Sequence, residues 1–259
     1  MHRASYFYKD CLFGSYPTQE GVNELESNGV KHFVDLTLQN EKLTKPYTTQ
    51  FSYLNFPIPD QKVPPNRVVF IKFLIDLVKL IKENLNENNK LYIHCKGGAG
   101  RAGTVVACLL FKLENLSPYS ALRKTLSCYH RRRDMSDRMR KIGAPATYNQ
   151  KNFVTSLCKE TNIYAIDKLS PEYYFMFTYK GNTYGSIYSA LKENQGELKN
   201  ILMERLLQFP EAVLELISSF GNIRYHSDNH LLGVKKNHVG ENAIGILYMK
   251  IRDSILREM

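Results

Sequence analysis

A short apolar segment that runs into a glycine-rich loop constrains the fold of this chain more than any other feature. Leu91–His94 has the composition of a buried β-strand and is followed at once by Cys95. Five residues, three of them glycine, separate Cys95 from Arg101, and the apolar run Val105–Leu110 then has the character of a helix. This order of strand, tight loop and helix predicts an α/β layered domain, a central sheet flanked by helices, with the loop at a strand's carboxyl end.

The loop itself has the composition of an anion cradle; its residues are Lys96, Gly97, Gly98, Ala99 and Gly100. Backbone N–H groups of a tight glycine-rich turn and of a helix N-terminus converge on one point and favour a phosphate group there. Arg101 adds a planar guanidinium that can hold two phosphoryl oxygens, and the same positive field favours the thiolate form of Cys95. A nucleophile inside a phosphate cradle predicts covalent catalysis through a phosphocysteine intermediate. A buried structural cysteine in a glycine-rich turn is the alternative interpretation.

This segment resembles the Cys-x5-Arg loop of the protein tyrosine and dual-specificity phosphatases. The resemblance implies hydrolysis of phosphate monoesters, phosphorylated proteins among them, without a metal or other cofactor. It implies that Cys95 is the nucleophile, that Arg101 binds the phosphoryl group and that His94 organises the loop. It also implies substrate contacts from Lys96, Gly97, Gly98, Ala99, Gly100, Ala102, His94 and Gln150. Lys96 is similar to the lysine of phosphoinositide-directed members, so a lipid phosphate is an alternative substrate.

Protonation of the departing oxygen requires an acid, and Asp60 is the candidate. It lies in the proline-rich segment 55–65, which resembles the acid-bearing loop of dual-specificity phosphatases, although an aspartate in an ordinary turn is the alternative. Asp134 and Asp137 are the next candidates. Segment 143–150 resembles the family's late loop, which implies that Gln150 positions water for the second step; an exposed polar residue is the alternative.

Ala102 departs from the family pattern, which usually has Ser or Thr directly after the loop arginine. The family's hydroxyl assists departure of the thiolate when the phosphoenzyme is hydrolysed. Turnover is therefore expected to be slow unless Thr104 or a water takes over that role. The departure also supports a second hypothesis, in which the protein is a binding or scaffold protein that captures phosphorylated ligands without turnover.

The length and the alternation of elements predict two domains, residues 1–160 and residues 161–259, because 259 residues exceed the usual size of one domain. In the first domain, strands are expected at 11–13, 32–36, 51–56 and 91–94. Helices are expected there at 19–28, 66–85, 103–116 and 118–129.

The net charge of +10 belongs entirely to the first domain, which holds 24 Lys and Arg against 14 Asp and Glu, whereas the rest is balanced. Much of this charge lies in the basic run Arg131–Lys141. Such a run is either a solvated face or a surface for an anionic partner such as RNA. An RNA 5′-phosphatase is therefore a further hypothesis, since some relatives of the resembled family remove phosphates from RNA ends.

The cysteines and the apolar segments exclude two classes of protein. The five cysteines are odd in number and include no Cys-x-x-Cys pair, which indicates reduced thiols rather than a disulfide framework. No apolar run reaches the roughly 20 residues of a membrane span, and the first residues lack the apolar core of a signal peptide. A soluble cytoplasmic protein is expected.

The second domain is expected to be a mainly helical α+β domain. A β-rich aromatic run at 173–179, expected to pack in the core, precedes a turn at 180–182 and helices at 186–194, 199–208, 210–220 and 243–256. Segments 169–188 and 228–252 resemble the NADAR family, which implies a ligand related to NAD or ADP-ribose and N-glycosidic chemistry.

Three residues break the NADAR pattern where its chemistry would reside. Pro171 replaces an expected Asn, Tyr188 an expected Glu and Leu232 an expected Trp. Since hydrolysis of an N-glycosidic bond requires a carboxylate, the resemblance implies a degenerate, catalytically inactive module, with residual glycosidase activity as the alternative. The spacing of His226, His230 and His238 does not indicate a metal site.

Overall fold

The computed structural model describes residues 3–133, 135–159, 161–163, 177–184, 190, 193–194, 197–208, 210–218, 220–225 and 243–259. The chain divides into two compact units, Met1–Cys158 and Lys159–Met259, each described separately below.

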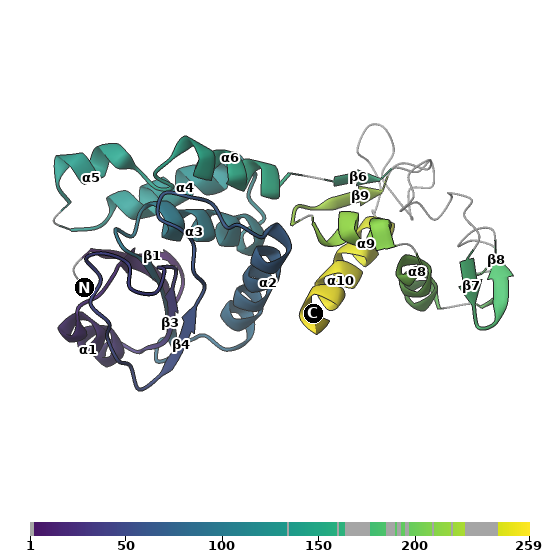
Figure 1. Cartoon of the computed structure of the whole chain (residues 1–259), viewed down its shortest axis with the longest axis horizontal. Helices are drawn as coiled ribbons and strands as arrows, with labels where there is room; N and C mark the ends of the chain where they lie inside the picture. The colour runs from purple at the N-terminus through teal and green to yellow at the C-terminus, as the bar shows by residue number, and fades with distance from the viewer. Residues whose placement is uncertain are drawn as a thin grey trace. The chain divides into compact units, whose positions relative to one another are not determined.

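A five-stranded sheet forms the centre of the first unit (Figure 1). Its strands are β1 Ala4–Tyr8, β2 Cys11–Ser15, β3 Val30–Asp35, β4 Ser52–Asn55 and β5 Lys90–Cys95. They lie in the order β1-β2-β5-β3-β4, with β1 antiparallel to β2 and the other neighbours parallel. The four expected strands are present, whereas β1 was not expected. Because parallel strands end at the same edge, the end of β5 lies between the ends of β2 and β3, where open sheets place their ligands.

Six helices are described in the first unit: α1 Gln19–Ser27, α2 Arg67–Glu83, α3 Gly100–Leu113, α4 Pro118–His130, α5 Asp137–Ile142 and α6 Tyr148–Leu157. Helix α1 contacts β3, while α3 contacts β1, β2 and β5 and is surrounded by α2, α4 and α6 (Figure 1). This central position explains why α3 is buried from Arg101 to Phe111. The unit is therefore an α/β domain whose mixed central sheet is flanked by helices.

Helix α3 differs from the other helices of this unit in how its N-terminus is capped. Each of the other five helices begins with a side chain that accepts a hydrogen bond from the first turn, supplied by Thr18, Asn66, Ser117, Ser136 and Thr147. Helix α3 has Ala99 at this position and no side-chain cap. Its first N–H groups are therefore left for another acceptor, which is the condition for an anion site at a helix N-terminus.

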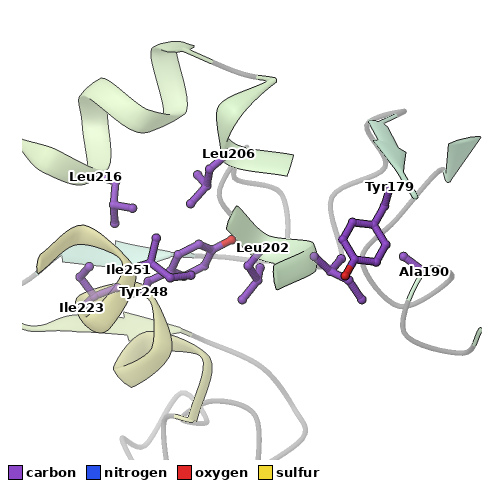
Figure 2. Close-up of a cluster of buried hydrophobic side chains, with 9 residues drawn as sticks. Tyr179, Ala190, Leu202, Leu206, Leu216, Ile223, Tyr248 and Ile251 are labelled. Atoms are coloured by element: carbon purple, nitrogen blue, oxygen red, sulfur yellow. The ribbon is translucent and has the colours of Figure 1, made fainter. Parts of the chain in front are cut away.

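The second unit contains short strands and three described helices. β6 Thr161–Ile163 pairs in parallel with β9 Ile223–Tyr225, and β7 Phe177–Tyr179 forms an antiparallel hairpin with β8 Asn182–Tyr184. The helices are α8 Leu198–Leu207, α9 Pro210–Ile217 and α10 Ala243–Glu258. They contribute to an apolar cluster (Figure 2) of Tyr179, Ala190, Ile201, Leu202, Leu206, Leu216, Ile223, Tyr248 and Ile251. The burial of Tyr179 agrees with the core position expected for the aromatic run.

Several residues singled out from the sequence lie outside the described part of the chain: Asp134, Pro171, Tyr188, His226, His230, Leu232 and His238.

Within the described ranges, none of the helices has the length and apolar character needed to cross a membrane.

Candidate active site

Cys95 occupies the last position of β5, and its side chain is buried. The neighbouring strands hold the backbone on either side of it. The Leu36 N–H donates to the carbonyl of His94 at 2.9 Å, and the Tyr16 N–H donates to the carbonyl of Lys96 at 3.1 Å. These two hydrogen bonds fix the sulfur at the carboxyl edge of the sheet, as the sequence predicts.

The glycine-rich loop packs closely against β2 at one position and against the Gln150 side chain of α6 at another. Gly98 has a φ of +69°, and a Cβ there would lie 2.3 Å from the carbonyl carbon of Gly14. A Cβ at Gly100 would lie 2.9 Å from the amide oxygen of Gln150. Gly97 has open space around it, so its small size is not required by packing. The close approach holds the backbone in the tight turn that a phosphate cradle needs.

The Arg101 side chain is buried at 1% exposure and is held by carboxylates. Its two terminal nitrogens bind both oxygens of Glu41, at 2.6 and 2.7 Å, in a bidentate pair. Nη1 also donates to the carbonyl of Ile58 at 3.1 Å. Burial alone would lower the pKa of Arg101, but the Glu41 hydrogen bonds and the nearby negative charges raise it above its ordinary value. The guanidinium is therefore fixed and charged.

Glu41 is a site residue that sequence reasoning missed. It follows β3 in the polar segment Gln39–Lys42, which carries no motif, so only the folded structure brings it to Arg101. Burial raises the pKa of the Glu41 carboxyl, but the hydrogen bonds and charge of Arg101 outweigh this and lower it overall. Glu41 is thus an anion at neutral pH, matched to the arginine that it holds.

The structure brings the predicted acid Asp60 to the same arginine. An Asp60 oxygen lies 2.9 Å from Nη2 of Arg101, and the side chain is 51% exposed. The same oxygen accepts the N–H of Gln61 at 3.0 Å. Asp60 is therefore a half-exposed carboxylate in contact with the buried Arg101. Asp137, the other described candidate, lies exposed in the first turn of α5.

Gln150 is buried, so its interpretation as an exposed polar residue is wrong. Its amide oxygen accepts the N–H of Thr147 at 3.1 Å and completes a capping box at the start of α6. Its amide nitrogen donates to the carbonyl of Lys62 at 3.1 Å. The side chain therefore ties α6 to the segment that carries Asp60, beside Gly100 of the loop. Its action on a water molecule stays a prediction.

His94 is fully buried next to the nucleophile and has two polar neighbours. Its Nε2 lies 2.7 Å from the hydroxyl of Tyr47, and its Nδ1 lies 3.7 Å from a carboxylate oxygen of Asp35. Burial lowers the pKa of His94 to about 4; Arg101 contributes to this shift, and Asp35 opposes it. The ring is therefore neutral at pH 7. We assign its proton to Nδ1, which faces the carboxylate, so that Nε2 accepts from Tyr47.

Asp35 is the third member of the network that contains His94 and Tyr47. Its carboxylate accepts hydrogen bonds from the N–H and the hydroxyl of Thr37, at 2.8 and 2.7 Å, and from the hydroxyl of Tyr53 at 2.8 Å. Burial raises the pKa of Tyr47 and of Tyr53, so both remain protonated donors. The Asp35 carboxylate is thus held by three donors, whereas Nδ1 of His94 has no hydrogen-bond partner among the described residues.

The first turn of α3 contains the departure from the family pattern. Ala102 is fully buried there and offers no hydroxyl. Thr104, the proposed substitute, is also buried, and its hydroxyl donates to the carbonyl of Gly100 at 2.9 Å. That donor is therefore engaged within the helix.

The basic run is not a uniform surface. Arg132 is buried at 2% exposure, so its interpretation as part of a solvated face is wrong. The exposed cations of the run are Arg131, Arg133, Arg138, Arg140 and Lys141. An anionic partner would therefore meet these five side chains and not Arg132.

The first unit is similar to known proteins. Residues 11–114 match the family described as "Polymorphic toxin system, DSP-PTPase phosphatase". The candidate tyrosine phosphatase 197R of Invertebrate iridescent virus 6 is 44% identical over 179 residues, covering 64% of this chain and 61% of that protein. The corresponding protein 067L of Invertebrate iridescent virus 3 is 37% identical over 156 residues, covering 60% and 65%.

The chain thus spans somewhat less than two thirds of the length of either viral relative. The solved structure of Tk-PTP in its active form is 26% identical, with a TM-score of 0.45, covering 60% of this chain and 95% of that one. By its match to that family and to the two viral proteins, the first unit is similar to tyrosine and dual-specificity phosphatases.

Proposed function

We propose that the first unit hydrolyses phosphate monoesters, phosphorylated proteins among them, through a phosphocysteine intermediate. The observation that carries this proposal is the convergence of Cys95, Arg101 and Asp60 at the carboxyl edge of one sheet. These three side chains come from β5, α3 and the segment after β4, and together they supply a nucleophile, a phosphate ligand and an acid.

In the first step the Cys95 thiolate attacks phosphorus, and the bond from phosphorus to the ester oxygen breaks. The departing oxygen takes the proton of Asp60, so the leaving group is a neutral alcohol or phenol. The loop N–H groups and the uncapped start of α3 hold the oxygens of the transferring phosphoryl group. No metal is needed, because fixed donors supply the positive field.

Arg101 binds the phosphoryl group through the guanidinium N–H that its described protein contacts do not use. The contacts described for its guanidinium use Nη1 and Nη2, which Glu41, Asp60 and the carbonyls of Leu36 and Ile58 occupy. Nε takes part in none of them, so its N–H is left for a phosphoryl oxygen. Glu41 keeps the fork in this orientation before the substrate arrives, which reduces the entropic cost of binding.

In the second step water attacks phosphorus, the S–P bond breaks and Asp60, now a carboxylate, takes a proton from the water. Inorganic phosphate leaves, and the thiolate is restored. Gln150 is the proposed positioning group for this water, because it lies beside Gly100 and borders the segment of Asp60. Ala102 supplies no hydroxyl to the leaving sulfur, so this second step is expected to limit the rate.

Steady hydrolysis of a small aryl phosphate by the purified full chain tests the proposal. Many turnovers per enzyme, lost in Cys95→Ser, would support a phosphatase. Phosphate binding without turnover would support the second candidate, a protein that captures phosphorylated ligands, which the buried Ala102 favours. An RNA 5′-phosphatase, favoured by the five exposed cations at 131–141, would show salt-sensitive RNA binding and release of terminal phosphate.

For the second unit we propose a degenerate NADAR-like module that binds a ligand related to NAD or ADP-ribose without hydrolysing it. The support is the likeness of segments 169–188 and 228–252 to that family, with Tyr188 where a carboxylate is expected. Calorimetric titration of the full chain with ADP-ribose tests this idea, and heat at the level of a buffer control would argue against it.

A further inference from the structure

Arg132 connects the far side of the phosphate loop to the sheet. Its Nη2 donates to the carbonyl of Gly98, in the loop, and to the carbonyl of Phe13, in β2, both at 3.0 Å. Its Nε donates to the hydroxyl of Ser5, in β1, at 3.3 Å. A single buried guanidinium therefore bridges two strands and the loop, although Arg132 belongs to neither the sheet nor the loop.

The guanidinium is held in place by two aromatic rings. Its central carbon lies 4.2 Å from the ring centre of Phe13 and 4.7 Å from that of Tyr129. Burial lowers the pKa of Arg132 to about 10, so the group still carries its charge at neutral pH. A cation between two rings is stabilised by their faces, and its planar donors keep one orientation.

The hydrogen bond from Arg132 to the Gly98 carbonyl also affects the direction of the next N–H in the loop, because of peptide geometry. In a trans peptide the carbonyl of one residue and the N–H of the next point in opposite directions. A Gly98 carbonyl that is drawn toward Arg132 therefore directs the N–H of Ala99 away from it, toward the phosphate side of the loop. Gly98 has the positive φ that this turn requires, and no other residue fits there.

We infer that Arg132 is a positioning residue of the phosphate loop. It holds the peptide between Gly98 and Ala99 so that an N–H faces the phosphoryl group, and it acts without touching the substrate. This inference rests on the proposed function and deepens it, since it names a residue from the basic run that supports the same site.

Arg132→Met, compared with Arg123→Met, tests the inference in the full chain. Methionine keeps an apolar stem of similar length but removes the donors, and Arg123 is an exposed arginine of α4 that undergoes the same substitution. We expect Arg132→Met to lower kcat/KM for an aryl phosphate at least about tenfold, while Arg123→Met keeps the wild-type value. In a Cys95→Ser background, affinity for inorganic phosphate should fall by a similar factor. Arg132→Lys should recover part of it.

A general loss of stability must be separated from a local effect on the loop. Val22→Ala removes buried atoms from the cluster around α1, involves no contact described for Arg132 and serves as a destabilised control. Hydrogen exchange of peptides covering residues 96–101 should be faster in Arg132→Met than in Val22→Ala or wild type. Wild-type exchange in Arg132→Met, or an equal loss of kcat/KM in Val22→Ala, would overturn the inference. A wild-type protein that neither binds nor hydrolyses phosphate would overturn the proposed function, while the exchange measurement would still decide the role of Arg132.

Discussion

The side chains of this site fall into two groups, those proposed to act on the substrate and those that support the site. Asp60 belongs to the first group. It is half-exposed yet lies within 2.9 Å of the buried Arg101, so it can meet an incoming ester and still lie within reach of the reacting centre. His94 illustrates the supporting kind, since it is buried and neutral and has no open path to substrate. These differences in exposure lead to separate predictions for the two residues.

For Asp60→Asn, we expect the rate on substrates with poor leaving groups to fall by about 10²–10⁴-fold, and much less on good leaving groups. The reason is that an alkoxide or ordinary phenolate needs a proton as it departs, whereas a nitrophenolate does not. Steady-state rates on a series of aryl phosphates measure this. Equal losses along the series would make Asp60 a structural partner of Arg101.

For His94, we expect a contribution to stability that is present at neutral pH and lost in acid. Its pKa is about 4 in the folded protein against an ordinary 6.5, so between these values the unfolded chain binds more protons. Stability should therefore fall as pH drops from 6.5 toward 4, by on the order of 2–3 kcal/mol from this group.

Urea unfolding followed by circular dichroism, at pH 7 and at pH 4, measures the effect in wild type and in His94→Gln. The stability advantage of wild type over the variant should shrink as the pH falls. The same advantage at both pH values would mean that His94 does not resist protonation in the fold.

At the scale of elements, we propose that the first turn of α3 sets the rate at which a phosphoenzyme is hydrolysed. Ala102 lies in its first turn, and the Thr104 hydroxyl is engaged with Gly100. We expect rapid mixing with an aryl phosphate to give a burst approaching one product per enzyme, followed by a slow steady rate. Ala102→Ser should raise the steady rate, because a hydrogen bond to the departing sulfur stabilises charge only as the S–P bond breaks. Without a burst, and with no gain in Ala102→Ser, dethiolation would not be the slow step.

The elements that carry strong local signals could be predicted from the sequence, and those that depend on tertiary contacts could not. β5 is an apolar strand, and the loop after it contains Gly98, where packing against Gly14 leaves no room for a side chain. Strand β1 alternates in burial, but the polar Ser5 is buried and the aromatic Tyr6 is exposed, so hydrophobicity does not follow that alternation. Helices α5 and α6 were not predicted, because segment 131–150 has the composition of a charged run followed by a loop.

The same limit applies to individual site residues. Cys95 and Arg101 belong to one motif and were found together, whereas Glu41 reaches Arg101 across 60 residues of sequence. Charge and polarity predict exposure for Arg132 and allow it for Gln150, yet the fold buries both. Each compensates for burial with hydrogen bonds to carbonyls of other segments. A sequence pattern does not report such partners.

At the scale of the whole molecule, two units share one chain, and the charge distinguishes them. The excess of positive charge lies in the unit with the phosphate loop, which favours the approach of anionic substrates. We propose that this unit transfers a phosphoryl group to Cys95. We assign the carboxylate-held Arg101 and the buried Arg132 roles in preparing that transfer.

Isolation of the covalent intermediate tests this claim most directly. The full chain is mixed with an aryl phosphate, quenched in acid within the burst, digested and analysed by mass spectrometry. We predict one phosphoryl group on the peptide that contains Cys95. We also predict that Cys95→Ser shows neither the phosphocysteine nor turnover while it retains phosphate binding. Undiminished turnover in Cys95→Ser, or a phosphoryl group on another residue, would contradict the account.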